Sequence, residues 1–407
     1  MSGTNPLPEV RRPAKHGYTL TELLVVSAIV SVVSGLLLPA VQSTRESARA
    51  ASCRNNVREV AGALLQHEQS MGHMPSGGWG PGWLGVADRG SDTGQPGSWI
   101  YDILPAMEAA NVHDSVAATT AATSTTDYRA CAAGTVPTFA CPTRRTGEPR
   151  RLSASVAYRT PFDTALTIDT GVVSDYAVNG GSTATCPPLD LLQKALAYVD
   201  GSTKVTFCHA PGDDPTKQNT QSLSLSATEQ GHDGHDEDHI GPCFTCDDDM
   251  ATIAIDPNSL SQGDQWRRIH PLGRLVLPDG GIPDLQDGIV ARMSQVRMTM
   301  IKDGLSNTYL VGEKYVAADR YQTASDAGDD RVMIAGYSSS TVRWAYDPPA
   351  QDAPGASQPN VFGSPHRSGV AMAFADGSVQ TLSFGIDPAV HRALAARADG
   401  TAVQRPE

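Results

Sequence analysis

The sequence predicts an α+β fold, in which a long, kinked N-terminal helix packs on an antiparallel sheet with long loops. An almost wholly apolar run covers residues 20–41, and apolar residues then recur at helical spacing from Ala50 to Met71. Farther along, large apolar residues alternate with small ones over 370–384, around an Asp-Gly pair that is typical of a β-hairpin. The first two observations predict one helix of about 50 residues, or some 75 Å at 1.5 Å per residue. The third predicts the sheet.

Charge is distributed unevenly along the 407 residues. The formal net charge is −13, but the leader over 1–17 holds Arg11, Arg12 and Lys15 against Glu9, so the remainder carries −15. An acidic body argues against nucleic acid as a partner, because a phosphate backbone is bound by clustered cations. The basic leader precedes an apolar run of about the length that spans a bilayer. By the positive-inside rule we expect a cytoplasmic N-terminus, a single span over 18–41 in the inner (cytoplasmic) membrane, and a periplasmic or extracellular remainder.

Glu22 is the only charged residue within this apolar run. A carboxylate at the centre of a membrane helix costs about 2.5–3.5 kcal/mol, and somewhat less near an end, so Glu22 is expected to have a partner. The segment Gly17-Tyr18-Thr19-Leu20-Thr21-Glu22 with the apolar run resembles the processing signal of type IV pilins and type II secretion pseudopilins. The resemblance implies cleavage by a prepilin peptidase after Gly17, methylation of Tyr18 as the new N-terminus, and pairing of Glu22 with a neighbouring subunit's terminal amine. The alternative is an ordinary signal anchor with a stray glutamate.

The helix is expected to continue beyond the membrane over 42–72. Pro39 predicts a kink. Charged residues fill the faces that the apolar residues leave, and Gly72 with Pro75 gives the stop signal. Such an amphipathic segment is expected to pack on a sheet.

A second resemblance begins in this helix and continues through the body, over 73–400. Its sequence blocks are Cys53-Arg54-Asn55-Asn56, Ser98-Trp99-Ile100, Phe139-Ala140-Cys141-Pro142, Asp175-Tyr176, Asp303-Gly304-Leu305-Ser306-Asn307-Thr308, Val311-Gly312-Glu313 and Phe362-Gly363-Ser364-Pro365-His366. With Asp376-Gly377 placed so that His366 and Asp376 bracket nine residues, these blocks resemble DUF1559 proteins, a subfamily abundant in planctomycetes and described as having a prepilin-type H-X9-DG domain. The resemblance implies an extracytoplasmic domain interrupted by an insert at about 186–262.

The motif residues of the body also have a structural interpretation. Asp376-Gly377 predicts a two-residue type I′ turn between two strands, and Asp303 with Asn307 predicts a turn that feeds a strand beginning at Tyr309. For His366 the sequence leaves open a role at the strand entry, in ligand binding or in neither. No nucleophile elbow and no phosphate loop are found in the sequence, so we expect no enzyme.

The insert allows three interpretations. Cys243 and Cys246, with either His239 or Cys208, fit a zinc site, although the second ligand pair that usually completes one is missing. Disulfides such as Cys131–Cys141 and Cys186–Cys208 fit an oxidising compartment. A solvated loop with neither is the third interpretation. The chain has seven cysteines, an odd number, and we expect Cys53 to be the unpaired thiol; apart from this zinc alternative no cofactor is expected.

These observations together predict a structural pilin-like or pseudopilin-like subunit of a type IV pilus or a type II secretion-like system. Its expected partners are the prepilin peptidase, the lipid bilayer and further pilin-like subunits, including copies of itself. The alternative is a membrane-tethered extracytoplasmic solute-binding protein, which would need a concave pocket in the body and would have no need of Glu22.

Overall fold

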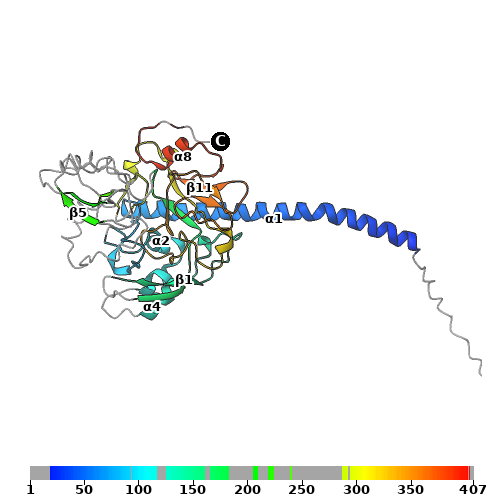
Figure 1. The fold of residues 1–407 in the computed structure, drawn as a ribbon, viewed down its shortest axis with the longest axis horizontal. Helices are drawn as coiled ribbons and strands as arrows, with labels where there is room; N and C mark the ends of the chain where they lie inside the picture. The colour runs from blue at the N-terminus through cyan, green and yellow to red at the C-terminus, as the bar shows by residue number, and fades with distance from the viewer. Residues whose placement is uncertain are drawn as a thin grey trace, which may run out of the picture. The chain divides into compact units, whose positions relative to one another are not determined.

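The computed structural model describes residues 19–92, 94–116, 125–160, 166–182, 205–209, 219–223, 239–240, 287–291, 294–401 and 403 (Figure 1). Gly17, Tyr18, Cys186, Cys243 and Cys246 lie outside these residues. By its contacts the chain divides after Ala48 into two compact units, and α1 runs through the point of division.

The predicted long helix is present. It is α1, Leu20–Met71, and it passes through Pro39 without a break. It ends at Gly72, whose φ of 77° is a conformation that glycine adopts readily and whose N–H donates to the Glu68 carbonyl. The other described α-helices are short: α2 (Trp99–Ile103), α3 (Ala110–His113), α4 (Thr125–Ala132) and α8 (Pro388–Ala395). At the start of α8 the Asp387 carboxylate accepts from the N–H groups of Ala389 and Val390, as an N-cap residue does.

The main sheet has five strands in the order β12-β11-β7-β3-β8. Their bounds are β3 Tyr176–Asn179, β7 Tyr309–Glu313, β8 Val342–Arg343, β11 Val370–Phe374 and β12 Val379–Leu382. The neighbouring pairs are antiparallel, as predicted, except that β8 joins the β3 edge in parallel. The sheet is therefore mostly antiparallel, with one parallel edge that no sequence pattern indicated.

Smaller sheets complete the described strands. β1 (Arg150–Tyr158) pairs with β2 (Leu166–Gly171) antiparallel, and β9 (Ala350–Gln351) pairs with β10 (Gly363–Ser364) in parallel. β4 (Val205–His209) lies between β5 (Asn219–Leu223) and β6 (His239–Ile240), antiparallel to both. These three described strands, in the range where an insert is expected, form a separate sheet.

Both faces of β11 are buried, and the alternation in its sequence separates two cores. Ala371 and Ala373 belong to the same apolar cluster as the buried residues of α1, whereas Val370, Met372 and Phe374 belong to a second cluster with residues of α8. Small side chains face the long helix and large ones face the short helix. Because alanine projects only a methyl group, the sheet can lie close to α1 on that face.

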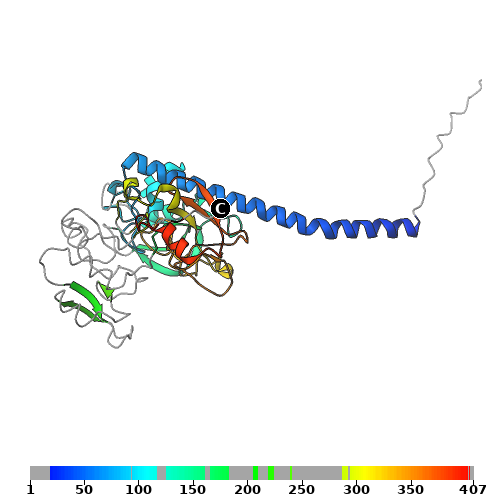
Figure 2. The same cartoon turned by 90° about the horizontal axis from the view of Figure 1, so that it is seen from above.

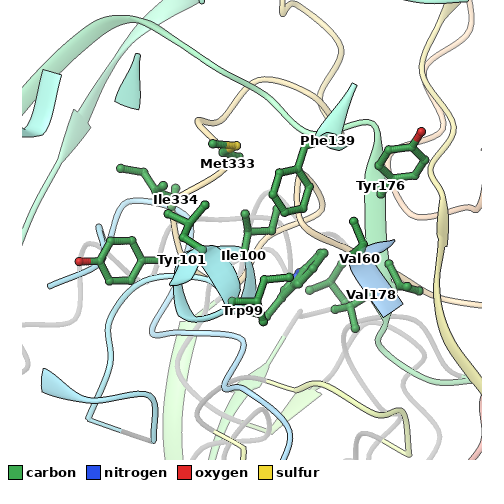
Figure 3. Packing of buried hydrophobic residues seen from close by; sticks show 14 of the residues in the cluster. Val60, Trp99, Ile100, Tyr101, Phe139, Tyr176, Val178, Met333 and Ile334 are labelled. Carbon is green, nitrogen blue, oxygen red and sulfur yellow. The ribbon is translucent and has the colours of Figure 1, made fainter. Parts of the chain in front are cut away.

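The part of α1 from Arg49 onward crosses the middle of the body in Figure 1 and lies along one edge of it in Figure 2, so it packs on one face of the body. Its buried residues are Cys53, Val57, Val60, Ala61, Ala63, Leu64 and His67. Figure 3 shows Val60 close to Val178 of β3 and to Trp99 of α2, with Phe139 and Tyr176 in the same cluster. The predicted amphipathic face of the helix is thus the face that covers the sheet.

The hairpin between β11 and β12 differs from the predicted two-residue turn. A type I′ turn needs positive φ at both central residues, but Gly377 has a φ of 82° and Asp376 has no positive φ. The Gly377 N–H donates to the Phe374 carbonyl, and the Phe374 N–H donates to the Ser378 carbonyl. The loop is therefore a three-residue turn that closes with a glycine bulge. A Cβ at Gly377 would lie 3.2 Å from Leu65 of α1, so the turn also fits against the long helix.

Two leucines of α1 give a matched test of this packing. Leu64→Ala removes a fully buried side chain and should lower the free energy of unfolding of the body by about 2–5 kcal/mol. Leu36→Ala removes the same atoms from a residue that is 72% exposed and should leave that free energy unchanged. Denaturant unfolding of the detergent-solubilised chain, followed by tryptophan fluorescence, measures both. Equal effects of the two substitutions would contradict the placement of Leu64 in the core.

Candidate functional site

The first turn of α1 places Glu22 beside Thr19. The Thr19 N–H and the Thr19 hydroxyl each donate to Glu22 Oε2 at 2.8 Å, and the Glu22 N–H donates to Thr19 Oγ1 at 3.3 Å. Reciprocal bonds of this kind between residues three apart form a capping box, which satisfies backbone donors at a helix start. Within a single chain the Glu22 carboxylate therefore has a local partner, a role that the sequence analysis did not foresee.

The segment of α1 that follows Glu22 presents apolar side chains that no described residue covers. Every residue from Leu20 to Arg45 is exposed, and an 18-residue apolar window of the helix has none of its residues buried. By length and composition this helix can cross a membrane. Its exposed large side chains are Leu20, Leu23, Leu24, Val25, Val26, Ile29, Val30, Val32, Val33, Leu36, Leu37, Leu38 and Val41. Such a surface needs lipid or other apolar helices around it.

A second site lies inside the body, where four side chains with metal-binding atoms meet. They are Cys53 of α1, Cys141, Glu313 at the end of β7 and His366, and the name thiol–histidine cluster is used for this set below. Cys141 follows the 3₁₀ turn Pro137–Phe139, and His366 lies between β10 and β11. The first three are completely buried, and His366 is 3% exposed.

The ligand atoms of the thiol–histidine cluster all lie within 4.8 Å of one another. Cys141 Sγ is 3.6 Å from His366 Nε2, and that nitrogen is 3.8 Å from Glu313 Oε1. Glu313 Oε2 accepts from the Ala371 N–H at 2.9 Å, but Glu313 Oε1 is buried and accepts no hydrogen bond from a described residue. A buried carboxylate oxygen without a donor is costly, so this oxygen is a distinctive feature of the cluster.

The proximity of these groups shifts their pKa values in opposite directions. A hydrogen bond between the two thiols lowers the pKa of Cys141 and raises that of Cys53, and burial adds to the rise at Cys53. Burial, together with the nearby Cys141, raises the pKa of Glu313 to about 7. The positive charge of Arg144 lowers the pKa of both Cys141 and Glu313, because it favours their ionised forms.

Two hydrogen-bonding side chains hold the segment around Cys141 in place. Asn56, one turn after Cys53 on α1, donates to the Ala140 carbonyl at 2.9 Å and to the Tyr176 hydroxyl at 3.2 Å. On the other side, the Cys141 N–H donates to Asp175 Oδ2 at 2.7 Å. The backbone at Cys141 is thus fixed from α1 and from the residue that precedes β3.

Asp175 belongs to a buried network of three cations and three carboxylates. Arg144 Nε binds Asp352 Oδ2 at 2.8 Å, Arg145 Nη1 binds Asp329 Oδ2 at 2.6 Å, and Lys314 Nζ binds Asp329 Oδ1 at 2.9 Å. Arg144 and Arg145 both also bind Asp175 Oδ1. All six side chains are at most 1% exposed. Their formal charges balance, which is what makes so much buried charge tolerable.

The structure separates the residues of the H-X9-DG motif. His366 lies in the thiol–histidine cluster, whereas Asp376 is in the hairpin turn at the other end of β11, where its Oδ1 accepts from the Ser378 N–H. Asp303 accepts from the N–H groups of Asp399 and Gly400, and so ties its turn to the segment after α8. Asn307, in the 3₁₀ turn before β7, donates through its N–H to the Gly304 carbonyl. Of these motif residues, only His366 reaches the cluster.

One of the expected cysteine pairings is corrected by the structure. Cys53, Cys131 and Cys141, whose side chains the structure describes, are all free thiols. The predicted Cys131–Cys141 disulfide is absent, because Cys131 Sγ points to the Val112 carbonyl at 3.3 Å while Cys141 lies beside His366. Cys53 is unpaired, as expected, and lies beside Cys141. The predicted zinc ligands Cys243 and Cys246 lie outside the described residues, and only the backbone of His239, in β6, is described.

No spacing rule could have assembled the thiol–histidine cluster, since Cys141 and His366 alone are 225 residues apart. The sequence does contain a weaker indication of the cluster. Each of the four residues lies within one of the sequence blocks identified above, from Cys53-Arg54-Asn55-Asn56 to the block that ends at His366. Isolated Cys, Glu and His residues within separate blocks of one chain are reasonable candidates for a shared site.

The comparisons define first a class and then a family. The model of the prokaryotic N-terminal methylation motif matches residues 12–38, which identifies a prepilin-type processed protein with an N-terminal apolar helix. This motif implies processing by a prepilin peptidase and, in general terms, pilin-like assembly. The model described as "Protein of unknown function (DUF1559)" matches residues 42–189 and 202–389. The chain belongs to the DUF1559 family. No curated protein and no solved structure matches it.

The buried network should make the stability of the body depend on acid pH. Burial alone would raise the pKa of Asp329, but Arg145 and Lys314 outweigh burial and hold the pKa at about 2. An unfolded aspartate titrates near about 3.9, so between these values only the unfolded chain binds the proton. The stabilisation is complete above about pH 4 and should decline as the pH falls towards 2, by about 2–3 kcal/mol for this group. Urea unfolding of the detergent-solubilised chain at pH 6, 4 and 3 measures the decline; a stability that stays constant would contradict it.

Removal of one carboxylate tests the charge balance directly. Asp329→Asn leaves Arg145 and Lys314 with an unmatched buried charge and should lower the free energy of unfolding at pH 7 by about 3–5 kcal/mol. Asp347→Asn makes the same chemical change at an exposed residue and should stay within about 0.5 kcal/mol of the wild type. Chemical denaturation of both variants gives the comparison. If Asp329→Asn leaves the free energy of unfolding unchanged, the network does not stabilise the fold.

Proposed function

We propose that this chain is a structural, non-enzymatic subunit of a type IV pilus or a type II secretion-like assembly. A prepilin peptidase cleaves it after Gly17, and the helix beginning at Leu20 holds it in the inner membrane. The N-terminus is cytoplasmic and the body is periplasmic or extracellular. The observation that carries the proposal is the combination of the methylation motif over 12–38 with a helix whose apolar side chains are uncovered from Leu20 to Val41.

The physical argument begins with this uncovered surface. Lipid can cover it in a monomer, and the corresponding helices of other subunits can cover it in an assembly. Small and β-branched side chains such as Ala28, Val32 and Gly35 allow close contact between helices in either setting. The same segment therefore supports both membrane storage and assembly.

Glu22 then has two successive partners. In the single chain the capping box with Thr19 satisfies the carboxylate, which lowers the cost of placing it near one end of a membrane helix. After cleavage Tyr18 would carry the terminal ammonium and Glu22 would be the fifth residue of the mature chain. Exchange of the Thr19 contacts for a neighbour's ammonium would pair two charges in an apolar setting, which is favourable only when both are present.

The first experiment follows processing. In the native cell, intact mass should show that the wild type has lost residues 1–17, and that Gly17→Ala retains them. The mature wild type should cross-link to other copies of itself in the cell envelope after formaldehyde treatment, and uncut Gly17→Ala should not, because it lacks the new amine. An uncut wild type would contradict the proposal at this first step.

The second experiment separates the two roles of Glu22. Glu22→Gln keeps a side chain that can complete a capping box but removes the charge, whereas Thr19→Ala removes the cap and keeps the charge. We expect both variants to be cleaved and to stay in the membrane. Glu22→Gln should lose the cross-linked multimers and Thr19→Ala should retain them.

The opposite pattern would assign Glu22 to helix capping alone. If Glu22→Gln forms multimers like the wild type, the ammonium partner is excluded. A cleaved but monomeric protein would then be better described as a membrane-tethered solute-binding protein.

A further inference from the structure

We propose that Cys53, Cys141, Glu313 and His366 form a structural zinc site that fastens α1 to the body. The proposal concerns the body alone and does not depend on whether the protein assembles. It also differs from the zinc alternative in the insert, because it uses none of the cysteines after residue 141.

The donor set suits zinc. Two sulfurs, one imidazole nitrogen and one carboxylate oxygen are all atoms that zinc accepts, and four protein ligands make a closed structural site. Thiolates disfavour calcium and magnesium, which take oxygen ligands. Two thiolates and a carboxylate would bring three negative charges to a divalent ion, and the buried Arg144 guanidinium acts on both Cys141 and Glu313.

The geometry is close to what a tetrahedral ion requires. With zinc–sulfur and zinc–nitrogen bonds of about 2.3 and 2.0–2.1 Å, a tetrahedral site places these two ligands about 3.6 Å apart. Cys141 Sγ and His366 Nε2 are 3.6 Å apart. The widest separation among the four ligand atoms stays within 4.8 Å, so small side-chain rotations would bring all of them to bonding distance.

A second observation, separate from the ligand distances, is that Glu313 Oε1 is buried without a hydrogen-bond donor from any described residue. Glu313 is completely buried, its Oε2 is satisfied by the Ala371 N–H, and its Oε1 points towards the cluster without a donor from any described residue. A cation between Glu313, His366 and the two thiols would satisfy it.

The positions of the four ligands explain what the ion would do. Cys53 belongs to α1, Cys141 to a segment held by Asn56 and Asp175, Glu313 to the centre of the sheet, and His366 to the loop before β11. One ion would therefore cross-link the long helix to three segments that are distant in sequence. In a subunit that is pulled or pushed through its helix, such a link would keep the body attached.

The first test measures metal in the full-length chain purified in detergent without chelators. Elemental analysis should find about one zinc per chain. After demetallation and reduction, one equivalent of cobalt(II) should produce the intense thiolate-to-cobalt charge-transfer absorption of a two-thiolate site, and zinc should displace it. Loss of zinc should lower the Tm. The absence of both zinc and saturable cobalt binding would overturn the proposal.

Matched variants locate the site. Cys53→Ser and Glu313→Gln should weaken zinc binding by more than the roughly 10–100-fold that loss of an outer hydrogen-bond partner costs. Cys131→Ser, which alters a buried free thiol outside the cluster, should bind one zinc like the wild type. If Cys53→Ser does not fold, the double variant Cys243→Ser/Cys246→Ser, which removes the two thiols of the alternative zinc site in the insert, decides instead. It should keep one zinc and the two-thiolate cobalt spectrum, and loss of both would overturn the assignment to Cys53 and Cys141.

A disulfide between Cys53 and Cys141 is the competing outcome. Mass spectrometry of peptides from the non-reduced, alkylated protein distinguishes the two: a zinc site leaves both residues alkylated once the metal is removed, and a disulfide joins their peptides. A joined Cys53–Cys141 peptide in the protein isolated from the cell would overturn the zinc assignment.

Discussion

The uncovered first part of α1 is the constraint on which the rest of the structure depends. From Leu20 to Arg45 no residue is buried, although most of the large side chains in the segment are apolar. Burial of apolar surface is worth roughly 25 cal/mol per Å², so this segment gains much more from lipid or from other helices than from water. The start of the same helix carries a carboxylate, and the capping box with Thr19 is what makes that charge tolerable in a single chain.

The later part of α1, from Arg49 onward, is instead covered by the body, which must hold it in place. Alanines on one face of β11 let α1 lie close to the sheet, and Asn56 and Cys53 connect the helix to the segment at Cys141. Behind that segment lies a neutral network of six buried charges, which fixes Asp175 and through it the Cys141 backbone. The helix is therefore anchored by packing, by hydrogen bonds and, in our proposal, by a metal ion.

Sequence reasoning predicted the elements that depend on local patterns. The long helix, its end at Gly72, the hairpin over 370–384 and the cap at Asp387 all follow from periodicity or from a residue's own backbone preference. It missed what tertiary contacts decide: the parallel β8 edge, the glycine bulge at Gly377 and the partners of the cysteines. Glu313, His366 and the two thiols come together only because α1 and the sheet pack as they do. The spacing of these residues in the sequence does not predict that contact.

A photo-cross-linking experiment in the native cell tests the central claim most directly, namely that the uncovered part of α1 contacts other subunits. A benzophenone amino acid would replace Leu24 or Leu36, both exposed on the helix, with Tyr346 on the body surface as the control position. Cross-links between copies of this chain, or to another pilin-like subunit, are expected from both leucine positions. Adducts to lipid alone at both positions, with the protein otherwise monomeric, would contradict it.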